Sequence, residues 1–349
     1  MLVLLFFLLL TWAHFTTLQP PEFQEEQVVC PDNTPEIEKD AKIKVISWNL
    51  QYLAGKTYVF YYDLPDGSGP DERPSTEEIK KTAAEVARVI QDEKPDIILF
   101  QEIDDGAKKT DYEDQLAKLL KLLPKDFKCH TSTFYWKADF IPHPHIMGSV
   151  GMKLSTISKY KIKSASRHAL PTIPDDILKK QFNFKRAILE ARLPVKEQKD
   201  FVVLNTHLDA FAQGSNTMEM QVKKIHGLLT KLTQEKVLWV IGGDFNLLPA
   251  DFDIHNIHPS QQSYYNPKSE ISILFDSFSS AATKEDLNGP NKEKFFTTVP
   301  NNPSISRLDK TIDYLFYSDT LRLANYRVRQ EDTQKISDHL PLVGEFEIK

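Results

Sequence analysis

The sequence of 349 residues contains only two cysteines, Cys30 and Cys129. Two thiols cannot build a disulfide scaffold or a zinc cluster of several thiolates. They could pair once in an oxidising compartment, or remain two free thiols with Cys129 buried, and the sequence leaves both alternatives open. Cysteine chemistry therefore does not explain what this chain does.

The chain also lacks an excess of basic residues. It has 43 Lys and Arg against 49 Asp and Glu, which gives a formal net charge of -6 at pH 7. A chain with this balance has no global attraction for polyanions, so binding to nucleic acid would depend on a local basic patch. Charge therefore disfavours long duplex DNA as a ligand. The hydrophobic content of 41% is ample for a packed core, which predicts a globular protein.

The N-terminus carries an uncharged apolar run, MLVLLFFLLLTWA. This run is shorter than the roughly 20 residues that a spanning helix needs, and its length suits the core of a signal peptide. No Lys or Arg precedes it, and TWA is a weak cleavage site. We expect residues 1–19 to be a signal peptide or an N-terminal anchor, and the protein to be secreted, periplasmic or tethered to a membrane.

The next segment, residues 20–41, is rich in proline and acidic residues and has no hydrophobic period. Such a composition predicts a disordered linker. No break in composition, internal repeat or low-complexity tract follows it, so residues 42–349 are expected to fold as one domain.

Short runs with the pattern of β-strands recur along this domain, and helical patterns are fewer. Helices are expected over residues 76–92, 111–123 and 216–235, where apolar residues recur at three and four spacing. The strand-like runs are KIKVISWNL, DIILFQE, GSVGMKLSTIS, RAILEARL, FVVLNTHL, VLWVIGGD, TIDYLFYS, RVRQE and LVGEFEI. Many strands with few helices between them predict an α/β sandwich, in which two sheets pack face to face with helices outside.

Polar side chains follow these apolar runs at the points where the runs end. One run leads directly into IGGDFNLLP, which presents a carboxylate and a carboxamide two residues apart. Each such residue has a structural explanation by itself, such as a turn, a cap or a satisfied core histidine. All of them together are better explained by one site at an edge of the sandwich. The residues are Asn49, Glu102, His207, Asp244, Asn246, Asp313, Asp338 and His339.

The chemistry of these side chains favours a hard metal ion. Glu102 and Asp338 offer carboxylate oxygens, and together with Asn49 they suit Mg²⁺, with Mn²⁺ as an alternative. The thiolate and multiple-histidine spacings of zinc sites are absent from the sequence. Asp244 could orient or deprotonate a water molecule, with Asn246 fixing its position.

His339 adds a group suited to a phosphate. With Asp313 as its orienting partner, it could hold an imidazolium against the negative oxygens of a phosphoryl group. These residues together predict metal-assisted attack of water on a phosphate ester.

The motifs WNLQ, FQE, NTHLD, GGDFN, TIDYLF and SDHLP, in this order, resemble the endonuclease/exonuclease/phosphatase superfamily over roughly residues 43–348. The resemblance implies a four-layered αββα sandwich of two packed mixed sheets with outer helices, and a Mg²⁺-dependent phosphoric ester hydrolase with residues 42–349 as its catalytic domain. It also implies a place for each residue: Asn49, Glu102 and Asp338 at the metal, His207 and His339 at the phosphate, Asp244 and Asn246 at the water, and Asp313 behind His339.

Two positions need separate comment. Some members of the superfamily place an acidic metal contact two residues after the first Asn, whereas this chain has Gln51, which puts a second metal in doubt. The run FNFKRAILEARL stands where many members carry a basic residue toward the phosphate, and Arg186 or Lys185 could serve as the substrate contact. The alternative is a strand whose basic residues face solvent.

Substrate choice is expected to depend on three aromatic loops, residues 52–74, 132–149 and 258–267. Their rings could stack unpaired bases, enter a membrane surface, or anchor the loops to the body. The substrate class stays open between a lipid, a small phosphodiester and nucleic acid. We expect a monomer that cleaves a phosphodiester, with a lipid head group or small phosphodiester slightly favoured. The alternatives are a secreted deoxyribonuclease I-like endonuclease and a catalytically idle relative that binds a phosphorylated partner.

Overall fold

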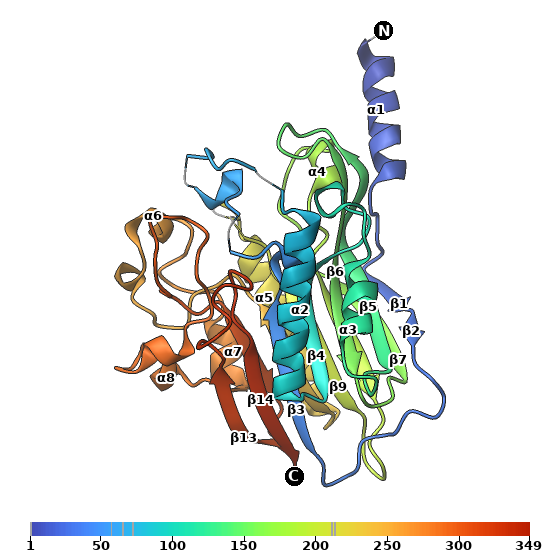
Figure 1. Cartoon of the computed structure of the whole chain (residues 1–349), viewed down its shortest axis with the longest axis vertical. Helices are drawn as coiled ribbons and strands as arrows, with labels where there is room; N and C mark the ends of the chain where they lie inside the picture. Colours follow the sequence, from blue (N-terminus) through green and yellow to red (C-terminus); the bar gives the residue numbers. More distant parts are fainter. Residues whose placement is uncertain (1, 57, 65, 72, 211, 213) are drawn as a thin grey trace.

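The computed structural model describes residues 2–56, 58–64, 66–71, 73–210, 212 and 214–349, and this part of the chain contains two seven-stranded sheets (Figure 1). Sheet A contains, in spatial order, β13 (Leu321–Val328), β14 (Leu342–Ile348), β3 (Lys42–Asn49), β4 (Ile97–Asp104), β6 (Gly148–Ser158), β5 (Cys129–Ile141) and β2 (Val28–Val29). Sheet B contains β1 (Phe23–Glu26), β7 (Ser164–Ala169), β8 (Ala187–Leu193), β9 (Phe201–His207), β10 (Leu238–Asp244), β12 (Asp313–Tyr317) and β11 (Ser279–Ser280).

The inner faces of the two sheets form one apolar core. Alternate residues of each strand point into it, as the two-residue period of a strand requires. In β10, Val240 belongs to this core, whereas its neighbours Trp239 and Ile241 point outward to the helices. Leu99 of β4 and Val203 of β9 are fully buried in the same inner core. Burial of this alternating set holds the two sheets face to face.

Helices cover both outer faces of the sandwich. The predicted helices are confirmed as α2 (Thr76–Glu93) and α3 (Gln115–Leu122) outside sheet A and α5 (Thr217–Gln234) outside sheet B, where α7 (Ser272–Ser277) joins it. Ser75 caps α2 by accepting the N–H of Glu78, whose carboxylate bonds back to the Ser75 N–H. The predicted four-layered αββα sandwich is therefore confirmed.

The remaining helical elements are short and lie in connections. They are the α-helices α4 (Lys179–Phe182), α6 (Pro259–Gln262) and α8 (Lys284–Asn288) and the 3₁₀ turns Gln51–Leu53, Tyr61–Asp63, Lys108–Thr110, Ile254–Asn256 and Lys292–Phe295.

The strand predictions differ from the structure in several places. Most of the expected aromatic loop over residues 132–149 is β5, whose threonine and aromatic residues suit a strand. The strand β7 was not predicted, because its polar sequence SASRHA has no apolar alternation. The run RVRQE contributes only its start to a strand, since β13 ends at Val328.

The prediction of a disordered linker over residues 20–41 is wrong for much of that segment. Its strand β1 pairs with β7 at the end of sheet B, and β2 pairs with β5 at the end of sheet A. An edge strand is held mainly by main-chain hydrogen bonds, so a polar sequence can form one without an apolar pattern. The segment therefore ties the edges of the two sheets together.

A disulfide joins Cys30, just after β2, to Cys129 at the start of β5. The sequence left open whether these two cysteines are bonded. In the structure β2 pairs with β5, which brings the two cysteines to a Cα separation of 4.2 Å. The bond closes a loop across 99 residues and fastens the N-terminal segment to sheet A.

The N-terminal apolar run forms α1 (Leu2–Thr16), which projects away from the sandwich at the end where α4 lies (Figure 1). Its base contacts the body, since the Trp12 ring lies 6.4 Å from that of Phe140 and 6.2 Å from that of Phe182. Side chains nearer the N-terminal end of this helix, such as Phe7 and Leu8, are more than half exposed. Within the described residues, no helix combines the length and apolar character needed to cross a membrane.

Replacing both Cys30 and Cys129 by serine should lower the free energy of unfolding by about 3 kcal/mol, because a cross-link over a long loop restricts the unfolded chain. Denaturant unfolding of the oxidised protein and of the double variant would measure the difference. Reductant should destabilise the wild type to the same extent and leave the double variant unchanged. Equal stability of the two proteins under oxidising conditions would contradict the expectation.

Candidate active site

The strand order brings the predicted residues to one edge of the sandwich. β3 runs parallel to β4 in sheet A, and β9 runs parallel to β10 in sheet B. Contact of Asn49 at the end of β3 with Asp244 at the end of β10 shows that the carboxyl ends of both pairs lie at the same edge. β12 is antiparallel to β10 and begins there, with Asp313 directly opposite Asp244, while His207 of β9 is opposite Asp244 on the other side. Residues far apart in the sequence thus become neighbours because of sheet register.

Asn49 connects the two sheets at this edge. Its Nδ2 donates hydrogen bonds to Glu102 Oε1 at 3.0 Å and to Asp244 Oδ2 at 3.0 Å. Glu102 lies within a bulge in the pairing of β4 with β6, between Phe100 and Ile103, and has a positive φ of 56°. A bulge can re-aim a side chain, and here the Glu102 carboxylate faces the site.

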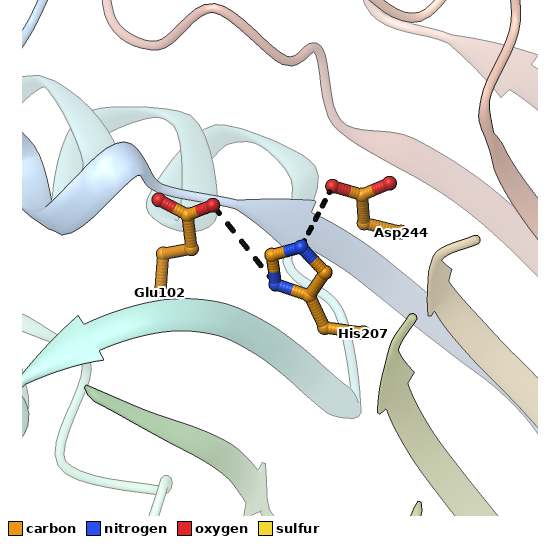
Figure 2. Close-up of side chains that lie close together, drawn as sticks. All are labelled: Glu102, His207 and Asp244. Atoms are coloured by element: carbon orange, nitrogen blue, oxygen red, sulfur yellow. Dashed lines mark ion pairs between the residues drawn. The ribbon is translucent and has the colours of Figure 1, made fainter. Parts of the chain in front are cut away.

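His207 lies between the two carboxylates, as Figure 2 shows. Its Nδ1 is 3.9 Å from Glu102 Oε1, and its Nε2 is 3.3 Å from Asp244 Oδ2. Burial, with the positive charges of Arg186 and His339, holds the pKa of His207 well below its usual value. The ring is therefore neutral at pH 7 and can accept or donate a hydrogen bond without carrying charge.

His339 has the opposite protonation state. Its Nδ1 lies 3.0 and 2.9 Å from the two carboxylate oxygens of Asp313, and its Nε2 lies 3.6 Å from Asp244 Oδ2. Burial opposes the charged ring, but Asp313 and Asp244 outweigh burial and raise the pKa of His339 well above its usual value. His339 is therefore an imidazolium at neutral pH, held in place through Nδ1 with its Nε2 directed at the site.

Asp244 is the carboxylate that both histidines approach. Its pKa is raised to about 7, first by burial and also by Asp313 and Glu102, against the lowering effect of His339. The N–H of Asn246 donates to Asp244 Oδ1 at 2.9 Å, and Asn246 Nδ2 donates to the Leu208 carbonyl at 3.1 Å. A carboxylate with this pKa can both lose and accept a proton near neutral pH.

The SDH turn before β14 supplies Asp338. Ser337 Oγ donates to the Asn49 carbonyl at 2.8 Å, which fixes the turn against the end of β3. Gln51 Oε1 accepts the N–H of Asp338 at 3.3 Å. The Gln51 carboxamide thus positions this turn.

The residues present fit a divalent cation. Ligand atoms of Glu102, His207 and Asp244 all lie within 4.8 Å of one another, and so do those of Asp244, Asp313 and His339. Burial and then the nearby Asp338 raise the pKa of Glu102. Carboxylates placed together out of water repel each other, and a bound cation would relieve that repulsion. The second group suits a cation less well, because its histidine is already charged.

Arg186, predicted to contact substrate, is only 4% exposed, so the alternative of a basic residue on a solvated strand face is wrong for it. Its Nε donates to Asp209 Oδ1 at 3.1 Å. Lys185 Nζ instead donates to the carbonyl of Lys180. Of the two candidates, Arg186 is the one that the fold brings beside His207.

Two residues at the site were missed from the sequence. Tyr135 of β5 places its hydroxyl 3.3 Å from His207 Nδ1, and it stood in a segment expected to be a loop. Asp209 belongs to the quoted motif NTHLD, but nothing in the motif indicates that its partner is a buried arginine. Both depend on contacts between strands that have no local sequence signal.

A profile described as the Endonuclease/Exonuclease/phosphatase family matches residues 46–339, most of the chain and all of the strand-end residues described above. The chain belongs to this family. It is therefore a hydrolase of phosphoester bonds, in agreement with the resemblance carried by its motifs. The grouping of Glu102, His207 and Asp244 is consistent with the divalent metals that such enzymes use.

Solved structures of this family share the fold. The chain is 20% identical, with a TM-score of 0.60, to an endonuclease/exonuclease/phosphatase from Beutenbergia cavernae, covering 88% of this chain and 72% of that one. The human Nocturnin catalytic domain with bound sulfate is 20% identical with a TM-score of 0.56, over 95% and 99% of the two chains. TDP2 from Caenorhabditis elegans is 15% identical with a TM-score of 0.51, over 88% and 74%. A search of curated proteins finds no match.

All the strand-end residues named from the sequence lie at this one edge, joined by the contacts above. Their grouping is thus seen in the structure, while the part that each plays in the reaction stays a prediction.

Replacing Asp313 by Asn should lower kcat by roughly one hundredfold or more, because the amide cannot hold the charge on His339. The Asp313 charge raises the pKa of His339, so its loss lowers that pKa. As pH rises, the variant should therefore lose activity at a lower pH than the wild type does. The pH dependence of kcat for wild type and Asp313→Asn would measure both. An unchanged alkaline limb would show that Asp313 does not control the His339 charge.

Proposed function

We propose that this protein is a Mg²⁺-dependent phosphodiesterase in which Asp244 acts on the attacking water and His207 and His339 bind the phosphate. The observation that carries the proposal is the pairing of a neutral and a charged histidine on one buried carboxylate, His207 at 3.3 Å and His339 at 3.6 Å from Asp244 Oδ2. This arrangement supplies a proton acceptor and a positive charge side by side, which attack of water on a phosphate ester needs.

Each side chain has a part in the proposed reaction. Asp244, whose pKa lies near neutrality, takes the proton of the water, and Asn246 keeps the Asp244 carboxylate in place. The His339 imidazolium attracts a phosphoryl oxygen most strongly as negative charge develops in the transition state. Asp313 maintains that charge from behind. Asn49, Glu102 and Asp338 would hold Mg²⁺, or Mn²⁺ in its place, and the cation would supply charge neutralisation at the phosphoryl oxygens. Of these three residues, Glu102 belongs to the group of ligand atoms that lie within 4.8 Å of one another.

The proposed substrate is a lipid head group or another small phosphodiester. The net charge of -6 supports this choice over duplex DNA, because it provides no attraction for a polyanion. The apolar surface of α1 supports a site of action near a lipid surface. A deoxyribonuclease I-like activity on nucleic acid is the second candidate. The filled set of strand-end residues argues against a catalytically idle relative.

Export is the proposed destination. The Cys30–Cys129 disulfide supports it, because such bonds persist mainly in oxidising compartments. The uncharged apolar sequence of α1 supports export through a signal peptide or tethering through an anchor.

The activity can be tested with sphingomyelin vesicles, plasmid DNA and a soluble inositol phosphate as parallel substrates. We expect hydrolysis of the sphingomyelin with Mg²⁺, none with chelator, and a loss of at least a thousandfold in Asp244→Asn, since an amide cannot accept the proton of the water. His339→Gln should lower kcat by more than it raises KM. Cleavage of plasmid DNA alone would favour the nuclease, and metal binding without turnover of any substrate would favour the idle relative.

Attachment to lipid is tested by comparing the full chain with residues 20–349 in flotation with phosphatidylcholine vesicles. The full chain should float with the vesicles and the shortened chain should remain in solution, because each buried CH₂ group of α1 contributes about 0.8 kcal/mol. The shortened chain keeps Cys30. Its hydrolysis of a soluble substrate would show that it is folded. Equal flotation of the two chains would contradict a lipid-binding α1.

A further inference from the structure

We propose that Asp209 and Gln221 are positioning residues that hold Arg186 so that the unpaired edge of its guanidinium binds a phosphoryl oxygen of the substrate beside His207. The inference rests on the proposed hydrolysis of a phosphate ester and deepens it, since it assigns the side of the site on which the phosphate is bound and the residues that fix it there.

The first link is a buried ion pair. Arg186 Nε donates to Asp209 Oδ1 at 3.1 Å, with the two side chains 5% and 3% exposed. Two aromatic rings hold the guanidinium, its carbon lying 4.9 Å from the ring centroid of Tyr135 and 4.2 Å from that of Phe184. Rings at these distances attract the cation and restrict its orientation.

The second link anchors Asp209 to a helix. Gln221 of α5, fully buried, donates from Nε2 to Asp209 Oδ2 at 2.7 Å and to the Pro171 carbonyl at 2.6 Å. In return the Asp209 N–H donates to Gln221 Oε1 at 3.1 Å. Both oxygens of the Asp209 carboxylate are therefore engaged, one by Arg186 and one by Gln221. These contacts fix the position of the Asp209 carboxylate, which in turn fixes the Arg186 side chain that donates to it.

Part of the Arg186 guanidinium has no hydrogen-bond partner in the described part of the chain. Structural arginine–carboxylate pairs are frequently bidentate, whereas Arg186 meets Asp209 through Nε. Its Nη1 is buried and has no hydrogen-bond partner in the described part of the chain. A buried N–H group without a partner is destabilising, more so when it is charged, so such a group calls for an explanation. A bound anion would satisfy it.

Tyr135 connects Arg186 to His207. The ring of Tyr135 packs on Arg186, and its hydroxyl lies 3.3 Å from His207 Nδ1, so one tyrosine touches both residues. An anion held here would meet the guanidinium on one side and the imidazole of His207 on another. A phosphoryl oxygen has the charge and geometry that a planar guanidinium binds well.

The test measures binding of inorganic phosphate by calorimetry in the presence of Mg²⁺, which needs no turnover. Arg186→Gln, Asp209→Asn and Gln221→Ala should each weaken phosphate binding, by about tenfold for the first two and by less for the third. In a background of Arg186→Gln, the change Asp209→Asn should weaken binding by less than twofold, because Asp209 acts through the arginine that is already gone. With a hydrolysed substrate, the Asp209→Asn change should raise KM by more than it lowers kcat.

A matched control comes from another buried ion pair. Arg329 Nη1 lies 2.8 Å from Glu93 Oε1, with the two side chains 8% and 5% exposed, and neither residue belongs to the site. Glu93→Gln should lower thermal stability as a broken buried pair does, while its affinity for phosphate stays that of the wild type. Thermal unfolding of every variant separates loss of folding from loss of binding.

The outcomes are distinguishable. Equal weakening by Asp209→Asn with and without Arg186, or wild-type phosphate affinity in Arg186→Gln, would overturn the inference and leave the proposed hydrolysis standing. No binding of phosphate by the wild type would also overturn it. Binding that depends on Arg186 and Asp209 as described, in a protein that hydrolyses none of the tested esters, would support the subsite while the proposed function fails.

Discussion

The buried carboxylate of Asp244 is the group on which the architecture of the site depends. It is 1% exposed, and charge in such a place must be matched by partners. Those partners come from both sheets: Asn49 from β3 of sheet A, His207 from the neighbouring β9 of sheet B, and His339 from the turn before β14. The two sheets must therefore face each other in one register, which their shared apolar core provides.

The two histidines show how position sets chemistry. Both lie against Asp244. Asp313 is within hydrogen-bond distance of His339 Nδ1, whereas the second carboxylate near His207, that of Glu102, is 3.9 Å away and the positive charge of Arg186 acts on the His207 ring. Negative neighbours stabilise the imidazolium of His339, and burial with positive neighbours keeps His207 neutral. The same residue type thus supplies a fixed charge at one place and a neutral ring at another, and the difference comes from Asp313 at the start of β12 and from Arg186 just before β8.

Support for the site extends outward into elements that carry no catalytic residue. α5 covers the outer face of sheet B with apolar residues, and from the same helix Gln221 reaches the buried pair of Asp209 and Arg186. The N-terminal segment closes both sheets at their edges and is cross-linked to β5, the strand that carries Tyr135. Stability and site geometry are linked here, because the strands and helix that bury the core also fix the angles of the polar side chains.

The sequence by itself determined the layered fold and the main residues of the site. Short apolar runs mark β3, β4, β9 and β10, and polar residues at the ends of these runs, including Asn49, Glu102 and Asp244, identify the edge where they meet. Local signals failed where a strand is held by its neighbours: β1 and β7 have polar sequences, β2 is only two residues long, and all three are held by main-chain pairing near the ends of the sheets. Only the tertiary structure decided the disulfide, the charges of the two histidines and the pairing of Arg186 with Asp209, because each depends on distances between segments that the order of residues does not specify.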